Sequence, residues 1–136
     1  MTFRRVSKDN IFFSNQQVNG VSSLVLDVAD FRNCIIQVAG SAAFVGSIFI
    51  AGAIGSVAPV FVWKSNNFAT PFSYLQAIDL ADGSASNGNA EGIEIRGTTL
   101  VRHFEVNINS IDWITVIVTA VKAGAVKVIA TVSTNL

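Results

Sequence analysis

The sequence contains one histidine and one cysteine, the side chains that most often serve as general base and nucleophile. A serine or cysteine hydrolase brings its nucleophile, base and orienting carboxylate together, so His103 would have to be the base. The alternation of residues 101–106 places His103 with Glu105 on the side of a strand that faces solvent, and Phe104 on the other side. Cys34 lies in a short apolar run, which is typical of a small buried hydrophobic residue. The two side chains therefore predict no catalytic pair, and we expect a protein that is not an enzyme.

Metal and phosphate sites also lack their usual residues. A zinc site needs four nitrogen or sulfur ligands, and one cysteine plus one histidine cannot supply them. The glycines at Gly52 and Gly55 match neither a phosphate-binding loop nor a dinucleotide fingerprint. The nine acidic residues are scattered, with no pair that stands out for glycoside cleavage. The sequence thus predicts no catalytic, cofactor-binding or metal-binding residue with a defined role.

One polar, oxygen-rich segment spans residues 79–92. Its side chains with hard oxygen atoms, the ligands that calcium prefers, are Asp79, Asp82, Asn87, Asn89 and Glu91. Their spacing differs from that of an EF-hand loop, and the Gly, Ser and Asn content is typical of a long surface turn. We favour a long surface turn here, a kind of loop that also serves as a contact surface, and calcium binding stays an open alternative.

Strands must position these residues, because period-two alternation recurs along the chain and no segment of a dozen residues shows helical periodicity with a cap and a stop. The predicted strands are residues 11–13, 21–28, 34–38, 44–50, 57–63, 74–80, 93–95, 101–107, 113–121 and 125–132. Residues 44–50 are apolar on both faces, which predicts a central strand, and residues 51–56 predict a turn. The last two strands, joined at Gly124, predict the clearest hairpin of the chain.

These strands predict an all-β fold, an antiparallel β-sandwich or jelly roll of about eight to ten short strands. The length of 136 residues suits one domain. We expect an N-terminal arm over residues 1–20 and a single sandwich domain over residues 21–136. The polar residues 1–10 of the arm are expected to add little to the core. The predicted core residues are Phe44, Ile48, Ile50, Phe104, Ile117 and Val128.

The charge content restricts the partners. Charged residues make up 13% of the chain and the formal net charge is zero, so there is no basic excess for nucleic-acid binding. Hydrophobic residues make up 51%, and a monomer with so few charges has difficulty staying apart from its neighbours. The composition therefore predicts a homo-oligomer, in which residues 1–20 and one sandwich edge contact adjacent subunits.

Residues 33–63 carry no charge, which raises the alternative of a membrane-spanning helix. Gly40, Gly46, Gly52 and Gly55 divide this run into strand-length pieces rich in Phe, Ile and Val. Such pieces favour buried strands over a membrane helix. We expect no membrane contact, and a small membrane protein is the third-ranked alternative.

The second half of the chain resembles small bacteriophage structural proteins. The resemblance is carried by residues 74–84, 88–92 and 101–107, by the strand that starts at Trp113 and by the turn at residues 122–124. Residues 40–49 are similar to a segment of the same proteins in which small residues lead into an aromatic strand. Residues 51–56 differ from the polar turn that is usual at this place in those proteins. The resemblance covers residues 21–134 and transfers no functional residue.

What the resemblance implies is a β-sandwich component of the virion. The function predicted first is that of a capsid decoration or cement protein, whose partners are its own copies and other virion proteins such as the major capsid protein. The alternative is a carbohydrate- or receptor-binding module of a tail or fibre, with residues 83–92 as its contact surface. Trp63 and Trp113 are candidates for a sugar platform in that case, although core or interface positions are favoured for both.

Overall fold

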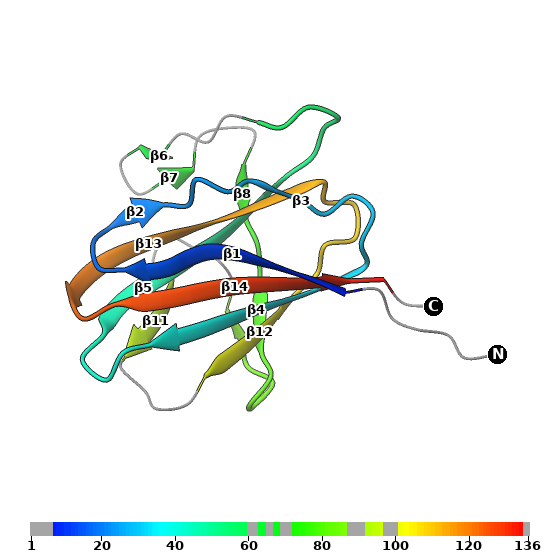
Figure 1. Cartoon of the computed structure of the whole chain (residues 1–136). Coiled ribbons are helices and arrows are strands. Elements are labelled where there is room, and N and C mark those ends of the chain that lie inside the picture. The colour runs from blue at the N-terminus through cyan, green and yellow to red at the C-terminus, as the bar shows by residue number, and fades with distance from the viewer. Residues whose placement is uncertain are drawn as a thin grey trace.

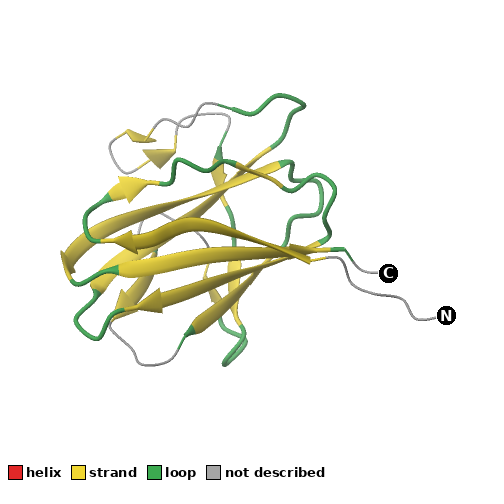
Figure 2. Ribbon diagram, in the orientation of Figure 1, coloured by secondary structure: helices red, strands yellow, loops and turns green. Residues whose placement is uncertain are grey.

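The computed structural model describes residues 7–59, 63–64, 67–68, 72–86, 92–96 and 101–134. These residues form strands and turns and contain no helix, so the predicted all-β fold is confirmed (Figure 2). The strands are β1 (Ser7–Gln16), β2 (Gly20–Val21), β3 (Leu26–Asp27), β4 (Asn33–Gly40), β5 (Val45–Ala53), β6 (Trp63–Lys64), β7 (Asn67–Phe68), β8 (Ser73–Tyr74), β9 (Ala77–Asp79), β10 (Ala85–Ser86), β11 (Ile93–Arg96), β12 (Arg102–Val106), β13 (Trp113–Ala123) and β14 (Val126–Ser133).

Two antiparallel sheets make up the sandwich (Figure 1). Sheet A has the order β1-β14-β4-β12-β9-β10. Sheet B has the order β11-β5-β13-β2, with β3 also beside β13 and β8 beside β5. Strands β6 and β7 pair with each other. The segments 21–28 and 74–80, each predicted as one strand, are each divided into two short strands.

The core lies between the two sheets, where alternation turns every second side chain inward. Sheet A contributes Cys34, Ile36, Val38, Phe104, Val106, Val126, Val128, Ala130 and Val132. Sheet B contributes Ile48, Ile50, Ile93, Ile95, Ile114, Val116 and Val118. All six predicted core residues are buried, none of them more than 2% exposed.

Strand β5 is central, as predicted, but it continues through Ala53 where a turn was expected after Ile50. The continuation is possible because its small residues face a second layer: Phe72 packs against Ala51 and Ala53 on the outer side of sheet B. A side chain at Gly52 would come within 2.8 Å of Leu75 Cδ1. The glycine that indicated a turn is therefore a point of close packing.

The predicted hairpin of the last two strands is wrong. Strand β13 pairs with β5 in sheet B, whereas β14 pairs with β4 and β1 in sheet A. The chain crosses between the sheets at Gly124, whose φ of 76° is open to glycine at little cost. Two β-branched runs joined by a short turn suit a hairpin, but their apolar faces are buried equally well when they face each other across a sandwich.

Residues 11–13, predicted as a short strand, belong to a longer edge strand of sheet A, β1, which takes in most of the second half of the predicted arm. Phe12 and Phe13 are buried in the core. The polar residues on both sides of them hide the full length of this strand in the sequence. Residues 1–6 lie outside the described residues.

The long uncharged run supplies β4 and β5, which lie in opposite sheets of the sandwich. Among the described residues, no helix is long and apolar enough to cross a membrane. The strand predicted for residues 57–63 is not formed at residues 57–59, residues 60–62 lie outside the described part, and Trp63 begins β6.

Candidate functional site

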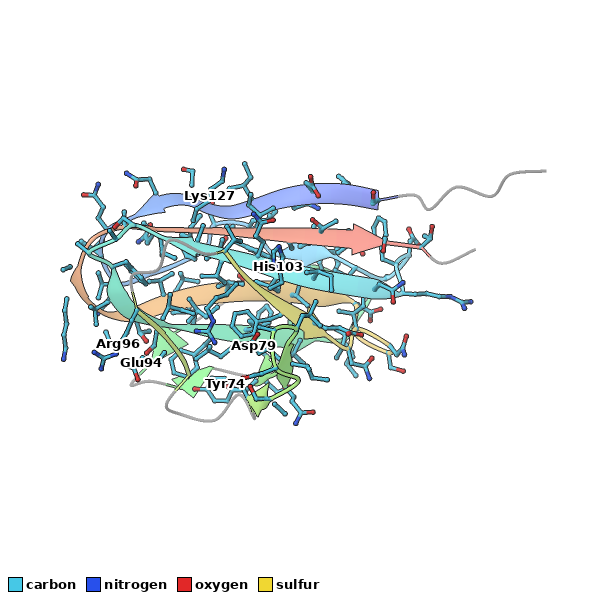
Figure 3. All side chains as sticks on the ribbon, turned by 90° about the horizontal axis from the view of Figure 1, so that it is seen from below. Tyr74, Asp79, Glu94, Arg96, His103 and Lys127 are labelled. Atoms are coloured by element: carbon cyan, nitrogen blue, oxygen red, sulfur yellow. The ribbon has the colours of Figure 1, made fainter. Side chains whose placement is uncertain are left out.

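His103 and Cys34 lie on opposite faces of sheet A. His103 is exposed on β12 (Figure 3). Gln37 of β4 is its cross-strand neighbour, and Glu105 lies on the same outward side of β12. Cys34 points into the core and is fully buried. This burial raises the pKa of the thiol to about 12, so the nucleophilic thiolate is scarce at neutral pH. The structure therefore keeps the one histidine and the one cysteine apart.

The described part of the oxygen-rich segment, residues 79–86, is a turn held by its own carboxylates. Asp79 accepts hydrogen bonds from the Ala81 amide and from Arg102 Nη2, both at 2.9 Å. Asp82 Oδ1 accepts a hydrogen bond from the Ser84 amide nitrogen at 2.9 Å. Hydrogen bonding lowers the pKa of both carboxyl groups, chiefly from the Ala81 amide for Asp79, and from the side chain and then the amide of Ser84 for Asp82.

The calcium alternative stays untested at its other three residues. Asn87, Asn89 and Glu91 lie outside the described residues. In the described part of the chain, no group of three or more His, Cys, Asp or Glu side chains is arranged to hold a metal ion.

Arg102 links the two sheets at this side of the sandwich. Its Nη2 bonds to Asp79 of sheet A, and its Nη1 donates to the carbonyl oxygen of Glu94 in sheet B at 3.0 Å. Its guanidinium lies 4.8 Å from the centre of the Phe104 ring. This role of Arg102 was not predicted from the sequence. The sequence does contain an indication of it, because Arg102 is a charged residue two positions before Phe104 and so lies on the same, inward side of the strand.

Trp113 anchors an exposed loop. Its Nε1 donates to the Gly55 carbonyl at 2.9 Å, while the Gly55 amide donates to Asp112 Oδ2 at 2.7 Å. The loop presents Ile54 and Val57 to solvent. The predicted sugar platform stays a prediction, because the side chain of Trp63 lies outside the described residues.

The outer face of sheet A is the solvent side of β1, β14, β4, β12 and β9. Cross-strand pairing sets its side chains in rows. One row contains Ile11, Ile129, Gln37 and His103. The next row along the strands contains Asp9, Thr131, Ile35, Glu105 and Ile78. On the other side of the first row, Lys127 pairs with Ala39.

This outer face carries isoleucines among its polar side chains. An antiparallel sheet with one wet face normally alternates between apolar residues inside and polar residues outside. On the two central strands β14 and β4, three of the eight outward positions are apolar, with Ile129, Ile35 and Ala39 among Lys127, Thr131, Ser133, Asn33 and Gln37. Ile11 on the neighbouring strand is 54% exposed. The face thus combines apolar contact area with polar groups in the same rows.

Searches of protein-family models and of curated proteins find no match for this chain. Two solved structures share its fold. The crystal structure of the SPBc2 prophage-derived protein YomS superposes with a TM-score of 0.70 at 13% sequence identity, covering 98% of each chain. The crystal structure of the PBSX exported protein XepA gives the same TM-score and identity, and covers 98% of this chain and 40% of that one. At this identity the likeness establishes the fold.

Proposed function

We propose that this protein is a structural component of a bacteriophage particle, acting through contacts between folded subunits and without catalysis. The observation that carries the proposal is the outer face of sheet A, where isoleucines occupy outward positions that a solvated sheet fills with polar residues. Exposed apolar surface of this kind is typical of protein contact surfaces.

The fold likeness supports a phage association. YomS is prophage-derived by its name, and XepA is named as a PBSX exported protein. The chain matches the whole of one and part of the other, which is consistent with a domain used both alone and within a longer protein. We therefore place the protein in the virion as a proposal, with the capsid exterior as its preferred position.

The side-chain chemistry supports a role without catalysis. Cys34 is enclosed in the core and His103 lies on the opposite face of the sheet. Asp79 and Asp82, the carboxylates with lowered pKa, are occupied by hydrogen bonds within a turn. A decoration or cement role requires only contact, with other copies and with the major capsid protein.

The test is to find the chain in purified particles. Phage particles are prepared from the organism that encodes the chain and are separated on a density gradient into filled heads, tails and soluble protein. The chain is then quantified by mass spectrometry in each fraction. A decoration or cement role predicts many copies in the head fraction, removable without loss of the major capsid protein. Recovery in the soluble fraction alone would contradict the proposal. Recovery with tails, together with binding on a glycan array, would favour the carbohydrate-binding alternative.

A further inference from the structure

We propose that the outer face of sheet A is the contact surface between two copies of this chain. The copies pack face to face with antiparallel strands, about a twofold axis that crosses the strands at the level of Ile129. This inference deepens the proposed function, on which it rests for its biological setting, by naming the partner as a second copy and the surface that binds it.

The apolar part of this surface is a diagonal stripe of four isoleucines. Ile11 is the direct cross-strand neighbour of Ile129. Ile35 lies diagonally from Ile129, because it pairs with Thr131 two residues further along β14. Ile78 continues the row of Ile35 on β9, beyond Glu105. Diagonal neighbours in a sheet lie within reach of long side chains, so Ile11, Ile129 and Ile35 form a continuous apolar surface over β1, β14 and β4. Glu105 on β12 separates this surface from Ile78.

Two of the charged residues on the face, Lys127 and Asp9, favour the antiparallel arrangement. Lys127 precedes Ile129 by two residues, whereas Asp9 and Thr131 lie two residues beyond it. A twofold axis across the strands at Ile129 therefore places Lys127 over Thr131 and Asp9 of the other copy. The symmetry forms this contact twice. A twofold axis along the strands would leave Lys127 level with Lys127 and Asp9 level with Asp9, and it would gain no charge pairing.

The size of the face suits a specific contact. Five strands spaced about 4.8 Å apart and seven residues of about 3.4 Å give a face of roughly 24 Å by 24 Å. The projected area of roughly 600 Å² approaches the area of about 800 Å² that each partner buries in a standard interface.

The free edge of β1 is a poorer contact than this face. Its pairing with β14 shifts register between Ile11 and Phe13 and again between Phe13 and Gln16, which bends the strand. The Ser22 hydroxyl donates to the Phe12 carbonyl at 3.2 Å and so occupies one group at the edge. A bent, partly occupied edge is a weak template for another strand.

The test measures self-association of the full chain by sedimentation velocity from about 1 to 100 μM. We expect a dimer that Ile129→Glu weakens at least tenfold in Kd. Asp9→Lys and Lys127→Asp should each weaken it, and the double variant should restore it, because the swapped charges again face each other. Ile54→Glu, which alters an exposed side chain away from sheet A, is the matched control and should leave Kd unchanged. Circular dichroism verifies that each variant keeps its strand content.

A wild-type chain that is monomeric at 100 μM would overturn the inference, and so would a double variant as weak as the single variants. Equal weakening by Ile54→Glu would also overturn it, because it would place the contact elsewhere. These results are independent of the particle fractionation. A monomeric chain that is found in particles would refute this interface and leave the proposed virion role standing. A dimer that is missing from particles would refute the virion role and leave this interface standing.

Discussion

The Arg102 guanidinium lies 2.9 Å from the Asp79 carboxylate and joins β12 to β9 within sheet A. The same guanidinium reaches the Glu94 carbonyl of sheet B. One side chain thus holds the two sheets together at the side of the sandwich opposite β1. The Asp79 side chain is 12% exposed and that of Arg102 33% exposed, so water screens the pair only in part.

Acid should weaken this link. The Ala81 amide and Arg102 hold the pKa of Asp79 below its ordinary value of 3.8, so the carboxylate stabilises the fold fully above that value. The contribution is lost as the pH falls through the lowered pKa of the folded state. We expect Asp79→Asn to reduce the free energy of unfolding by about 1–2 kcal/mol at pH 7 and by less at pH 2–3. Urea titrations at several pH values measure the difference. A loss that is independent of pH would show that the charge of Asp79 contributes nothing.

The crossing at Gly124 should tolerate no side chain. Its φ is 76°, and a Cβ atom there would lie 2.5 Å from the Phe44 nitrogen. Gly83, with a φ of 74° and open space around it, is the matched control. Gly83→Ala should cost about 1–2 kcal/mol from backbone strain, and Gly124→Ala about 1–3 kcal/mol more from the clash. Chemical denaturation compares the two variants. Equal losses would mean that the backbone shifts freely at Gly124.

Ile117 should behave as a packed residue although it lies outside the main core. It is 1% exposed and sits between Phe49 and Val21 in the ladder of sheet B. Truncation to Ala removes buried methyl groups and leaves a cavity, so the free energy of unfolding should fall by about 2–5 kcal/mol. Ile54→Ala, at a position 67% exposed, should change it by less than about 0.5 kcal/mol. Urea denaturation of both variants measures the two changes. A fall in the free energy of unfolding for the Ile117 variant as small as that for the Ile54 variant would contradict the prediction.

Cys34 should report opening of the core. Its burial and its pKa of about 12 make the thiol both inaccessible and protonated. At pH 8 we expect an aromatic disulfide reagent to label the native protein far more slowly than the same chain in denaturant. The labelling rate, followed by absorbance, then measures the opening of the sandwich. Rapid labelling of the native state would show that the position of β4 fluctuates.

Removal of residues 1–10 should destabilise the domain. Ser7 to Asn10 pair with Ser133 to Ala130, and the Thr131 hydroxyl donates to Asp9 at 2.6 Å. At about 0.2–1 kcal/mol for each cross-strand pair, the loss should be about 1–3 kcal/mol. The control is a chain without residues 1–6, which keeps all of β1. Thermal unfolding of the two truncated chains gives the difference. Identical midpoints would restore the sequence-based expectation that this segment adds little to the core.

Local alternation in the sequence was sufficient to predict individual strands and their inward faces. The run from Cys34 to Val38 and the run around Phe104 alternate cleanly, and both form strands with the predicted residues inside. Burial on one face of a strand leaves a period of two in the sequence, and this pattern needs no knowledge of the neighbouring strand.

Pairing between strands could not be predicted in the same way. The apolar runs on each side of Gly124 are equally buried as a hairpin or as facing strands, and the choice depends on β5 and β4, which occupy the ladders beside them. The hydrogen bonds of Arg102 to Asp79 and Glu94 also depend on how strands far apart in the chain align with one another. The rows of side chains on the outer face depend on the same alignment. Alternation showed which way His103 and Glu105 point, but not that Gln37 and Ile78 lie beside them.

The pairing of Ser7 with Ser133 has a mechanical consequence. Strands β1 and β14 are antiparallel, so these two residues lie side by side at one end of sheet A (Figure 1). A force that pulls them apart opens the β1–β14 ladder like a zipper, loading one hydrogen-bonded pair at a time. A force along the strands would instead shear many pairs at once. A force that separates Ser7 from Ser133 therefore acts in the direction in which the β1–β14 pairing resists least. Compression on the broad face of sheet A is instead distributed over five strands.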